Sequence, residues 1–193
     1  PLESSFDPHT LQRFAKFADI ELPNGTTEDQ ANWILKHNLH QWVDFKCWMI
    51  TDFVAQAKAI MQAQPDDKPM GMSIVPAIPS EREHLLGQRV PELSQVVDFI
   101  SPMLYHHILG RSPTWITDKL DEFADGTHAK LLPYLQANVL GHAEDSFPIH
   151  EWKAILDAVL AHKHTTGFIV FTGNALRTHQ RGNTLRNALA RIQ

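Results

Sequence analysis

Four short apolar runs, each followed by a helical pattern, constrain the fold of this chain more than any other feature. They read MGMSIVPAI, VVDFISPMLY, AKLLPYLQANV and TGFIVFTG, and they predict strands near residues 70–76, 97–105, 130–137 and 167–172. Strands that are apolar throughout are buried on both faces, which is typical of parallel sheets covered by helices. Strands that alternate with helices form right-handed βαβ units. The pattern therefore predicts an α/β fold with parallel strands and outer helices.

The length of 193 residues suits one domain of ordinary size. Apolar residues recur at helical spacing in residues 1–65, before the first strand. We therefore expect a single domain over 1–193, with a helical segment over 1–65 and four βα units over 66–193.

Two closures of such a sheet are possible, an open doubly wound sheet or a (β/α)8 barrel. The doubly wound sheet usually has a glycine-rich phosphate loop after its first strand. None of the segments that follow the four runs is a G-x-G-x-x-G sequence or a P-loop, which disfavours nucleotide binding. Four strands are half of a barrel, and a whole barrel takes ~250 residues.

Composition excludes several classes of function. The net charge is −5 and no run of lysine or arginine occurs, so we expect no nucleic-acid partner. No apolar run approaches the ~18 residues of a membrane span. The one cysteine, Cys47, excludes an internal disulfide and does not fix the compartment. The opening PLESSFDPHT lacks Met and is not a signal peptide, so we expect further sequence upstream.

Three stretches, VVDFISPMLYHH, LLPYLQANV and TGFIVFTGNAL, resemble the last three strands of glycoside-hydrolase-type TIM barrels. The resemblance is strongest to bacterial glycosyl hydrolases whose sixth strand carries a D-x-I-x-P-M-x-Y motif, matched here by residues 98–105. The segments before the first run are similar to the parts of these proteins that follow the fourth strand: SSFDPHTLQRFAKFADIELP and HQWVDFKCWMITDFVAQAKAI.

This resemblance implies the C-terminal half of a (β/α)8 TIM barrel that acts on a carbohydrate by hydrolysing O-glycosidic bonds. It implies no cofactor, and it is compatible with a secreted or periplasmic location. Four strands alone expose two sheet edges, which favour pairing with other chains. We therefore expect the remaining half of the barrel, or self-association, to complete the sheet.

Residues at the carboxyl ends of the strands are the candidate site, because TIM barrels bind substrates there. Tyr105, His106 and His107 end the second predicted strand and are expected to face a sugar. Pro102 removes a backbone donor, which a strand tolerates best at a bulge. Such a bulge would direct Tyr105 into the cleft.

Other strand ends add residues that suit sugar recognition. Gln136 and Asn138 lie two apart, so they share one side of the strand. Their amides provide both donors and acceptors for hydroxyl groups. Tyr134 offers a ring for stacking, and Asn174 follows the fourth strand. We expect these residues to contact the substrate.

Glycoside hydrolysis normally needs two carboxyl groups, ~5–5.5 Å apart in retaining enzymes and ~6.5–9.5 Å apart in inverting ones. By the resemblance, the acid would lie just before Pro1, in upstream sequence, and the nucleophile would follow the seventh strand, where this chain has Gln136. The remaining weak candidates are Glu81 and Glu144, both expected in loops. The sequence therefore shows no complete catalytic pair.

Three functions stay open: a glycoside hydrolase, a barrel that binds carbohydrate without catalysis or serves as a structural domain of a larger protein, and an unrelated α/β enzyme with His106 or His107 as a base. Metal ligands are conceivable at His106 and His107, or at His162 and His164. Adjacent histidines point different ways on a strand, and no H-E-x-x-H sequence occurs. We therefore expect no bound metal.

Overall fold

The computed structural model describes residues 6–65, 68–138, 147–177 and 179–191. The chain divides into two compact units, the first formed by Pro1–Asp66 with Ala77–Val96 and the second by Asp67–Pro76 with Val97–Gln193. The single domain expected over 1–193 stays a prediction.

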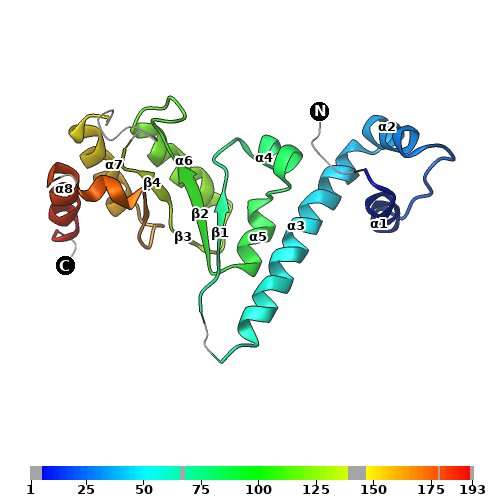
Figure 1. The fold of residues 1–193 in the computed structure, drawn as a ribbon, viewed down its shortest axis with the longest axis horizontal. Coiled ribbons are helices and arrows are strands. Elements are labelled where there is room, and N and C mark those ends of the chain that lie inside the picture. Colours follow the sequence, from blue (N-terminus) through cyan, green and yellow to red (C-terminus); the bar gives the residue numbers. More distant parts are fainter. Residues whose placement is uncertain (1–5, 66–67, 139–146, 178, 192–193) are drawn as a thin grey trace. The chain divides into compact units, whose positions relative to one another are not determined.

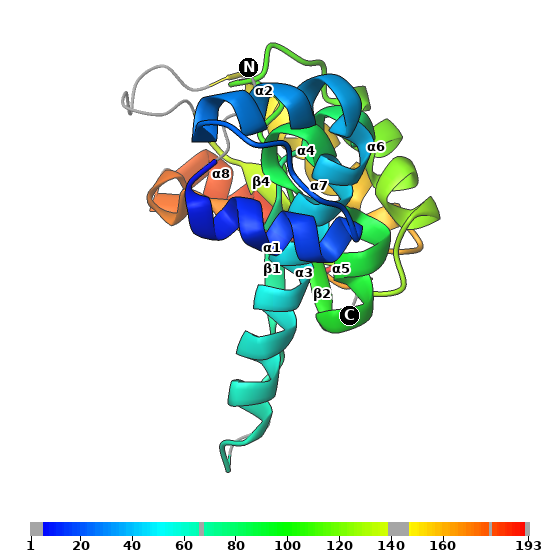
Figure 2. The ribbon, with the colours of Figure 1, turned by 90° about the vertical axis from the view of Figure 1, so that its right-hand side faces the viewer.

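The first unit is helical (Figure 1). Its described helices are α1 (Pro8–Ala18), α2 (Thr27–His37), α3 (Leu39–Gln62), α4 (Pro79–Leu86) and α5 (Val90–Val96). Helices α1 and α2 pack against the first half of α3, as Figure 2 shows. The Trp42 ring stacks on Phe6 with centroids 4.6 Å apart, and it meets the edge of Phe14 at 5.0 Å. The helical segment predicted before residue 65 is present.

Helix α4 includes Glu81, which we expect in a loop from the sequence, so that expectation is wrong. Pro79 suits the first helical turn because its φ is already helical. Gly87 ends the helix with a φ of 64°, which favours glycine. A Cβ at Gly87 would lie 2.9 Å from the Lys46 carbonyl oxygen. Glu81, expected in a loop, is an exposed residue in the first turn of this helix.

The second unit contains a parallel sheet. Its described strands are β1 (Gly71–Ile74), β2 (Phe99–Leu104), β3 (Lys130–Leu131), β4 (Tyr134–Gln136) and β5 (Ile169–Phe171). The order is β1-β2-β4-β5, with β3 also paired to β2, and every pairing is parallel. The order follows the sequence without reversal, as predicted for a barrel segment. The third predicted strand is divided into β3 and β4.

The division lies opposite Pro102. Strand β2 pairs with β3 up to Ile100 and with β4 from Met103. The carbonyl oxygen of Ile100 accepts a hydrogen bond from Leu132 N at 2.9 Å, so alternate residues of β2 face this edge. The N–H that Pro102 lacks would face the same edge, within the interruption. The break in pairing, rather than the expected bulge, thus accommodates the proline.

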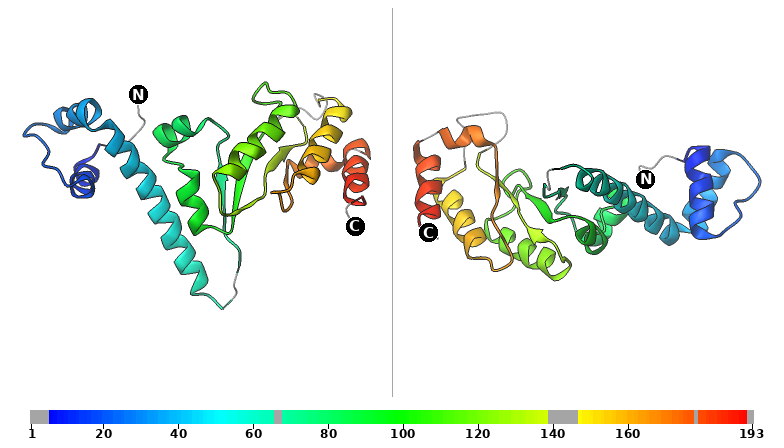
Figure 3. Two further views of the ribbon diagram at one scale, coloured as in Figure 1. Left: turned by 180° about the vertical axis from the view of Figure 1, so that it is seen from behind. Right: turned by 90° about the horizontal axis from the view of Figure 1, so that it is seen from below.

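The two faces of this sheet differ in burial. Helix α6 (Thr114–Asp125) packs against β2 and β3, followed by α7 (Ile149–Ala161) and α8 (His179–Leu189), each beside the previous helix (Figure 3). The helix-covered face holds side chains that are 0% exposed: Ile74, Ile100, Leu104, Leu131 and Leu135. By register, the opposite face holds two kinds of side chain. Ser101 and Gln136 are buried there, whereas Ser73, Met103, Tyr105, Tyr134 and Phe171 are half-buried or exposed. The opposite face is therefore less completely buried than the helix-covered face, although the apolar runs predict burial on both.

The described helices include none that is long and apolar enough to cross a membrane, as the sequence predicts.

Gly71 gives a test of the β1–β2 pairing. A Cβ at this position would overlap the ring of Phe99, its partner in β2. We expect Gly71→Ala to lower the free energy of unfolding by about 1–3 kcal/mol, because the ring has to shift. Gly173→Ala is the control, since nothing lies within 4 Å of a Cβ there. Equal urea midpoints for the two variants would contradict this close approach.

Cys47 gives a test of the packing of α3. Its side chain is 0% exposed, and burial raises the pKa of its thiol to about 11. We expect the native protein to react negligibly with a thiol reagent at about pH 8, because the thiolate is the reactive form. The same reagent should titrate one thiol in guanidinium chloride. Equal rates of thiol modification in the native and the denatured protein would show that Cys47 is accessible in the native state.

Candidate functional site

Three aromatic rings gather on the half-exposed face of the sheet, toward the carboxyl ends of its strands. The Tyr105 ring, just after β2, stacks on Phe171 of β5 with centroids 4.8 Å apart. Its centroid lies 6.4 Å from that of Tyr134, in an edge-on arrangement. The hydroxyl of Ser73 donates to the Tyr134 hydroxyl at 3.4 Å. We call Tyr105, Tyr134 and Phe171 the aromatic cluster.

The environment of Tyr105 is partly apolar. Burial raises the pKa of its hydroxyl, and the neighbouring Tyr134 raises it further. Tyr105 therefore stays neutral at physiological pH and offers an uncharged ring and a hydroxyl donor. This combination suits a ligand that presents both C–H and O–H groups.

Gln136 ends β4, opposite Phe171 of β5, and its side chain links two segments at the strand ends. Its side chain is 0% exposed. Its Oε1 accepts from the backbone N–H of Ile108 at 3.1 Å, and its Nε2 donates to the carbonyl oxygen of Asn138 at 2.7 Å. The amide thus ties the turn after β2 to the end of β4.

The remaining predicted site residues lie in varied surroundings. Asn138 is half-buried directly after β4, and His107 is exposed in the turn after β2. Asn174 is exposed in the short helix η1 (Gly173–Arg177), which follows β5. Glu81 belongs to the first unit, and Glu144 lies outside the described residues. Contact of these side chains with a substrate stays a prediction.

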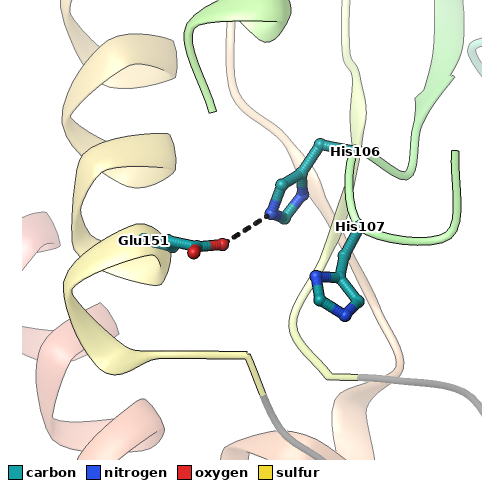
Figure 4. A group of neighbouring side chains, drawn as sticks. All are labelled: His106, His107 and Glu151. Carbon is teal, nitrogen blue, oxygen red and sulfur yellow. Dashed lines mark ion pairs between the residues drawn. The ribbon is translucent and has the colours of Figure 1, made fainter. Parts of the chain in front are cut away.

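His106 lies apart from the aromatic cluster and faces helix α7. Its Nε2 is 3.5 Å from Oε2 of Glu151, in the first turn of that helix (Figure 4). The Phe147 ring meets His106 edge-on at 4.8 Å and stacks on His107 at 5.5 Å. Burial lowers the pKa of His106, while the nearby Glu151 opposes that shift. His106 is therefore held mainly as the neutral imidazole.

The two histidines do not diverge as the strand argument predicts. Strand β2 ends at Leu104, and the following residues form a turn, so the alternation of a strand no longer applies. The ring centroids of His106 and His107 are 6.1 Å apart. Together with Glu151 they form the one group of possible metal ligands found among the described residues. His162 does not belong to this group; its Nε2 lies 3.1 Å from Oδ1 of Asp121, in an ion-pair geometry.

Sequence reasoning misses Glu151. Its signal is weak, because an acidic residue in the first turn of a helix is common for reasons of helix stability. What distinguishes it is position, since α7 follows β4 and its first turn returns to the carboxyl ends of the strands. Glu151 meets His106 only in the tertiary fold, because the two residues are 45 positions apart in the sequence.

No protein-family model and no curated protein sequence matches the chain. Among solved structures, the PgaB (BpsB) glycoside hydrolase domain from Bordetella bronchiseptica is similar in fold, with a TM-score of 0.72 and 17% sequence identity. The match covers 95% of this chain and 52% of that one, so the chain spans about half the length of that structure. The predicted α/β class is confirmed: a parallel sheet with surrounding helices that resembles a glycoside hydrolase barrel domain.

Gln136 can be tested through stability. Gln136→Leu keeps the approximate volume but leaves the Ile108 N–H and the Asn138 carbonyl without this partner. We expect the free energy of unfolding to fall by about 1–3 kcal/mol, the cost of buried groups left unsatisfied. Asn174→Ala, which removes an exposed amide, serves as the control in the same urea titration. A Gln136→Leu midpoint equal to wild type would show that the two hydrogen bonds contribute nothing.

Proposed function

We propose that this chain forms half of a carbohydrate-active barrel that belongs with the bacterial glycosyl hydrolases and cleaves O-glycosidic bonds. The observation that carries the proposal is the aromatic cluster on the half-exposed sheet face, toward the carboxyl ends of parallel strands. Those ends are where barrels of this architecture bind substrates. The likeness to a glycoside hydrolase domain supports the same assignment through its fold.

The chemistry of the cluster fits a sugar ring. A pyranose has apolar C–H faces that pack against aromatic rings and hydroxyl groups at its edge. Tyr105 and Tyr134 offer both an aromatic face and a hydroxyl, and Phe171 extends the apolar wall. Aromatic side chains combined with a few polar groups are typical of small-molecule binding sites.

The half-exposed face supports the presence of a second half. In a closed barrel the inner face packs against the residues of the opposite strands. Here that face carries Met103, Tyr105 and Phe171, all only half-buried in the described structure. We propose that a further part of the barrel, or a second copy of the chain, covers this face. That part would also enclose the sugar-binding site at the carboxyl ends of the strands.

Catalysis needs groups beyond the aromatic cluster. Two carboxyl groups are normally required, and Glu81 and Glu144 stay the weak candidates within this chain. We propose that the catalytic acid comes from the part of the barrel that precedes this segment. If that part supplies no carboxylate, the same cluster supports the second candidate, a barrel that binds carbohydrate without cleaving it.

The binding proposal is tested with Tyr105→Ala and Tyr105→Phe in the longest available form of the protein. A glycan array selects an oligosaccharide, and calorimetry then measures its affinity. We expect Tyr105→Ala to lose about 1–2 kcal/mol of binding, roughly five- to thirtyfold in Kd, because a stacking face is removed. Tyr105→Phe keeps the ring and should stay close to wild type.

Circular dichroism shows whether the alanine variant keeps its fold, since Tyr105 also stacks on Phe171. Unchanged affinity in a folded Tyr105→Ala variant would refute the sugar-binding role of the cluster. Release of reducing ends from the selected oligosaccharide separates the hydrolase from the non-catalytic binder.

A further inference from the structure

A pair of histidines and a carboxylate come together outside the aromatic cluster. His106 and His107 come from the turn after β2, and Glu151 comes from the first turn of α7 (Figure 4). One nitrogen or oxygen atom of each lies within 4.8 Å of those of the other two. We propose that these three residues bind a divalent transition-metal cation, with zinc as the preferred ion. The proposal does not rest on the carbohydrate function.

The donor set selects the class of cation. Two imidazoles and one carboxylate are a known ligand set of zinc sites that keep a fourth position for water. Calcium and magnesium prefer oxygen ligands, and the cluster offers only the carboxylate of Glu151. Among first-row divalent cations, imidazole suits zinc, copper, nickel and iron.

Two of the ligands already have a suitable spacing. His106 Nε2 lies 3.5 Å from Glu151 Oε2, at the outer limit for a hydrogen bond. In a tetrahedral site with zinc bonds of ~2.0–2.1 Å, neighbouring ligand atoms lie about 3.3 Å apart. The separation of His106 and Glu151 is therefore close to that of two zinc ligands.

The buried ring nitrogens of His106 lack good hydrogen bonds. Its side chain is 0% exposed, Nδ1 has no hydrogen-bond partner among the described residues, and Nε2 has only the Glu151 carboxylate at 3.5 Å. A buried polar atom without a partner destabilises the folded state. Coordination of a cation by Nε2 would satisfy this nitrogen, while the edge of Phe147 against the ring restricts its orientation.

His107 is the ligand that has to move. It is exposed and rests on the face of Phe147 with centroids 5.5 Å apart. An exposed side chain changes between staggered rotamers at little cost. We therefore expect rotation of His107 to bring the ligand atoms, which lie within 4.8 Å of one another, to the distances of a zinc site.

Arg181 is the competing charge at this site. Its guanidinium lies 4.4 Å from the centroid of Phe147, donates to the Phe147 carbonyl oxygen, and interacts electrostatically with Glu151. It reduces the negative charge that a metal ion meets at the carboxylate. We therefore expect weaker binding than in a site whose carboxylate is not shared.

The experiment is a calorimetric titration of the whole chain with zinc chloride, after removal of bound metal by a chelator. Wild type should show one saturable site. His107→Ala and Glu151→Gln should each weaken binding by at least about tenfold, because each removes a ligand. His150→Ala is the matched control: this exposed histidine is in the same helical turn as Glu151 and outside the cluster.

Cobalt provides a second readout, because its visible spectrum reports a four-coordinate site without any assay of activity. The spectrum and a zinc-dependent rise of the melting temperature should appear in wild type and His150→Ala, and both should be lost in His107→Ala. The chain has 12 histidines, so diffuse weak binding is the alternative. Absence of a one-to-one site, wild-type affinity in His107→Ala, or equal loss in His150→Ala would overturn the proposal.

Discussion

Parallel pairing of β2 along both of its edges is the interaction on which the second unit depends. Strand β1 pairs with residues 99–102, and β3 and β4 share the other edge. The end of β2 then supplies consecutive residues to two different places. Tyr105 joins the aromatic rings on the half-exposed face, and His106 turns toward Glu151 of α7. One strand end thereby positions side chains of both proposed sites.

The difference between the two sheet faces links the fold to its proposed use. Ile100, Leu104 and Leu135 are completely buried on the helix-covered face, and this burial stabilises the sheet. The opposite face keeps half-buried aromatic rings that would be costly to leave in water over a large area. We propose that a complementary barrel half and a sugar cover this surface. The hydrogen bonds of Gln136 fix the strand ends beneath it, so the rings stay in place.

The group formed by His106, His107 and Glu151, here called the histidine cluster, follows a different physical rule. Buried polar groups are normally hydrogen-bonded, and His106 departs from that rule within the described structure. A cation is one way to satisfy it, and the neighbouring carboxylate and second histidine are the groups that a cation needs. Ring stacking holds the aromatic cluster together. The distinguishing feature of the histidine cluster is the buried His106 ring, whose nitrogens lack good hydrogen bonds.

The sequence by itself determined the strands, their parallel order and the residues at their ends, because these depend on apolar runs and on chain connectivity. Tyr105 and Tyr134 could be placed near the carboxyl ends of two strands on that basis. The tertiary structure decided which residues far apart in the sequence contact one another. Gln136 reads as a sugar ligand in the sequence, but its amide meets the backbone of Ile108. Glu151 reads as an ordinary helix-start acid until α7 brings it to His106. Apolar spacing is a local property of the chain, while the partner of a polar group is set only when remote segments meet.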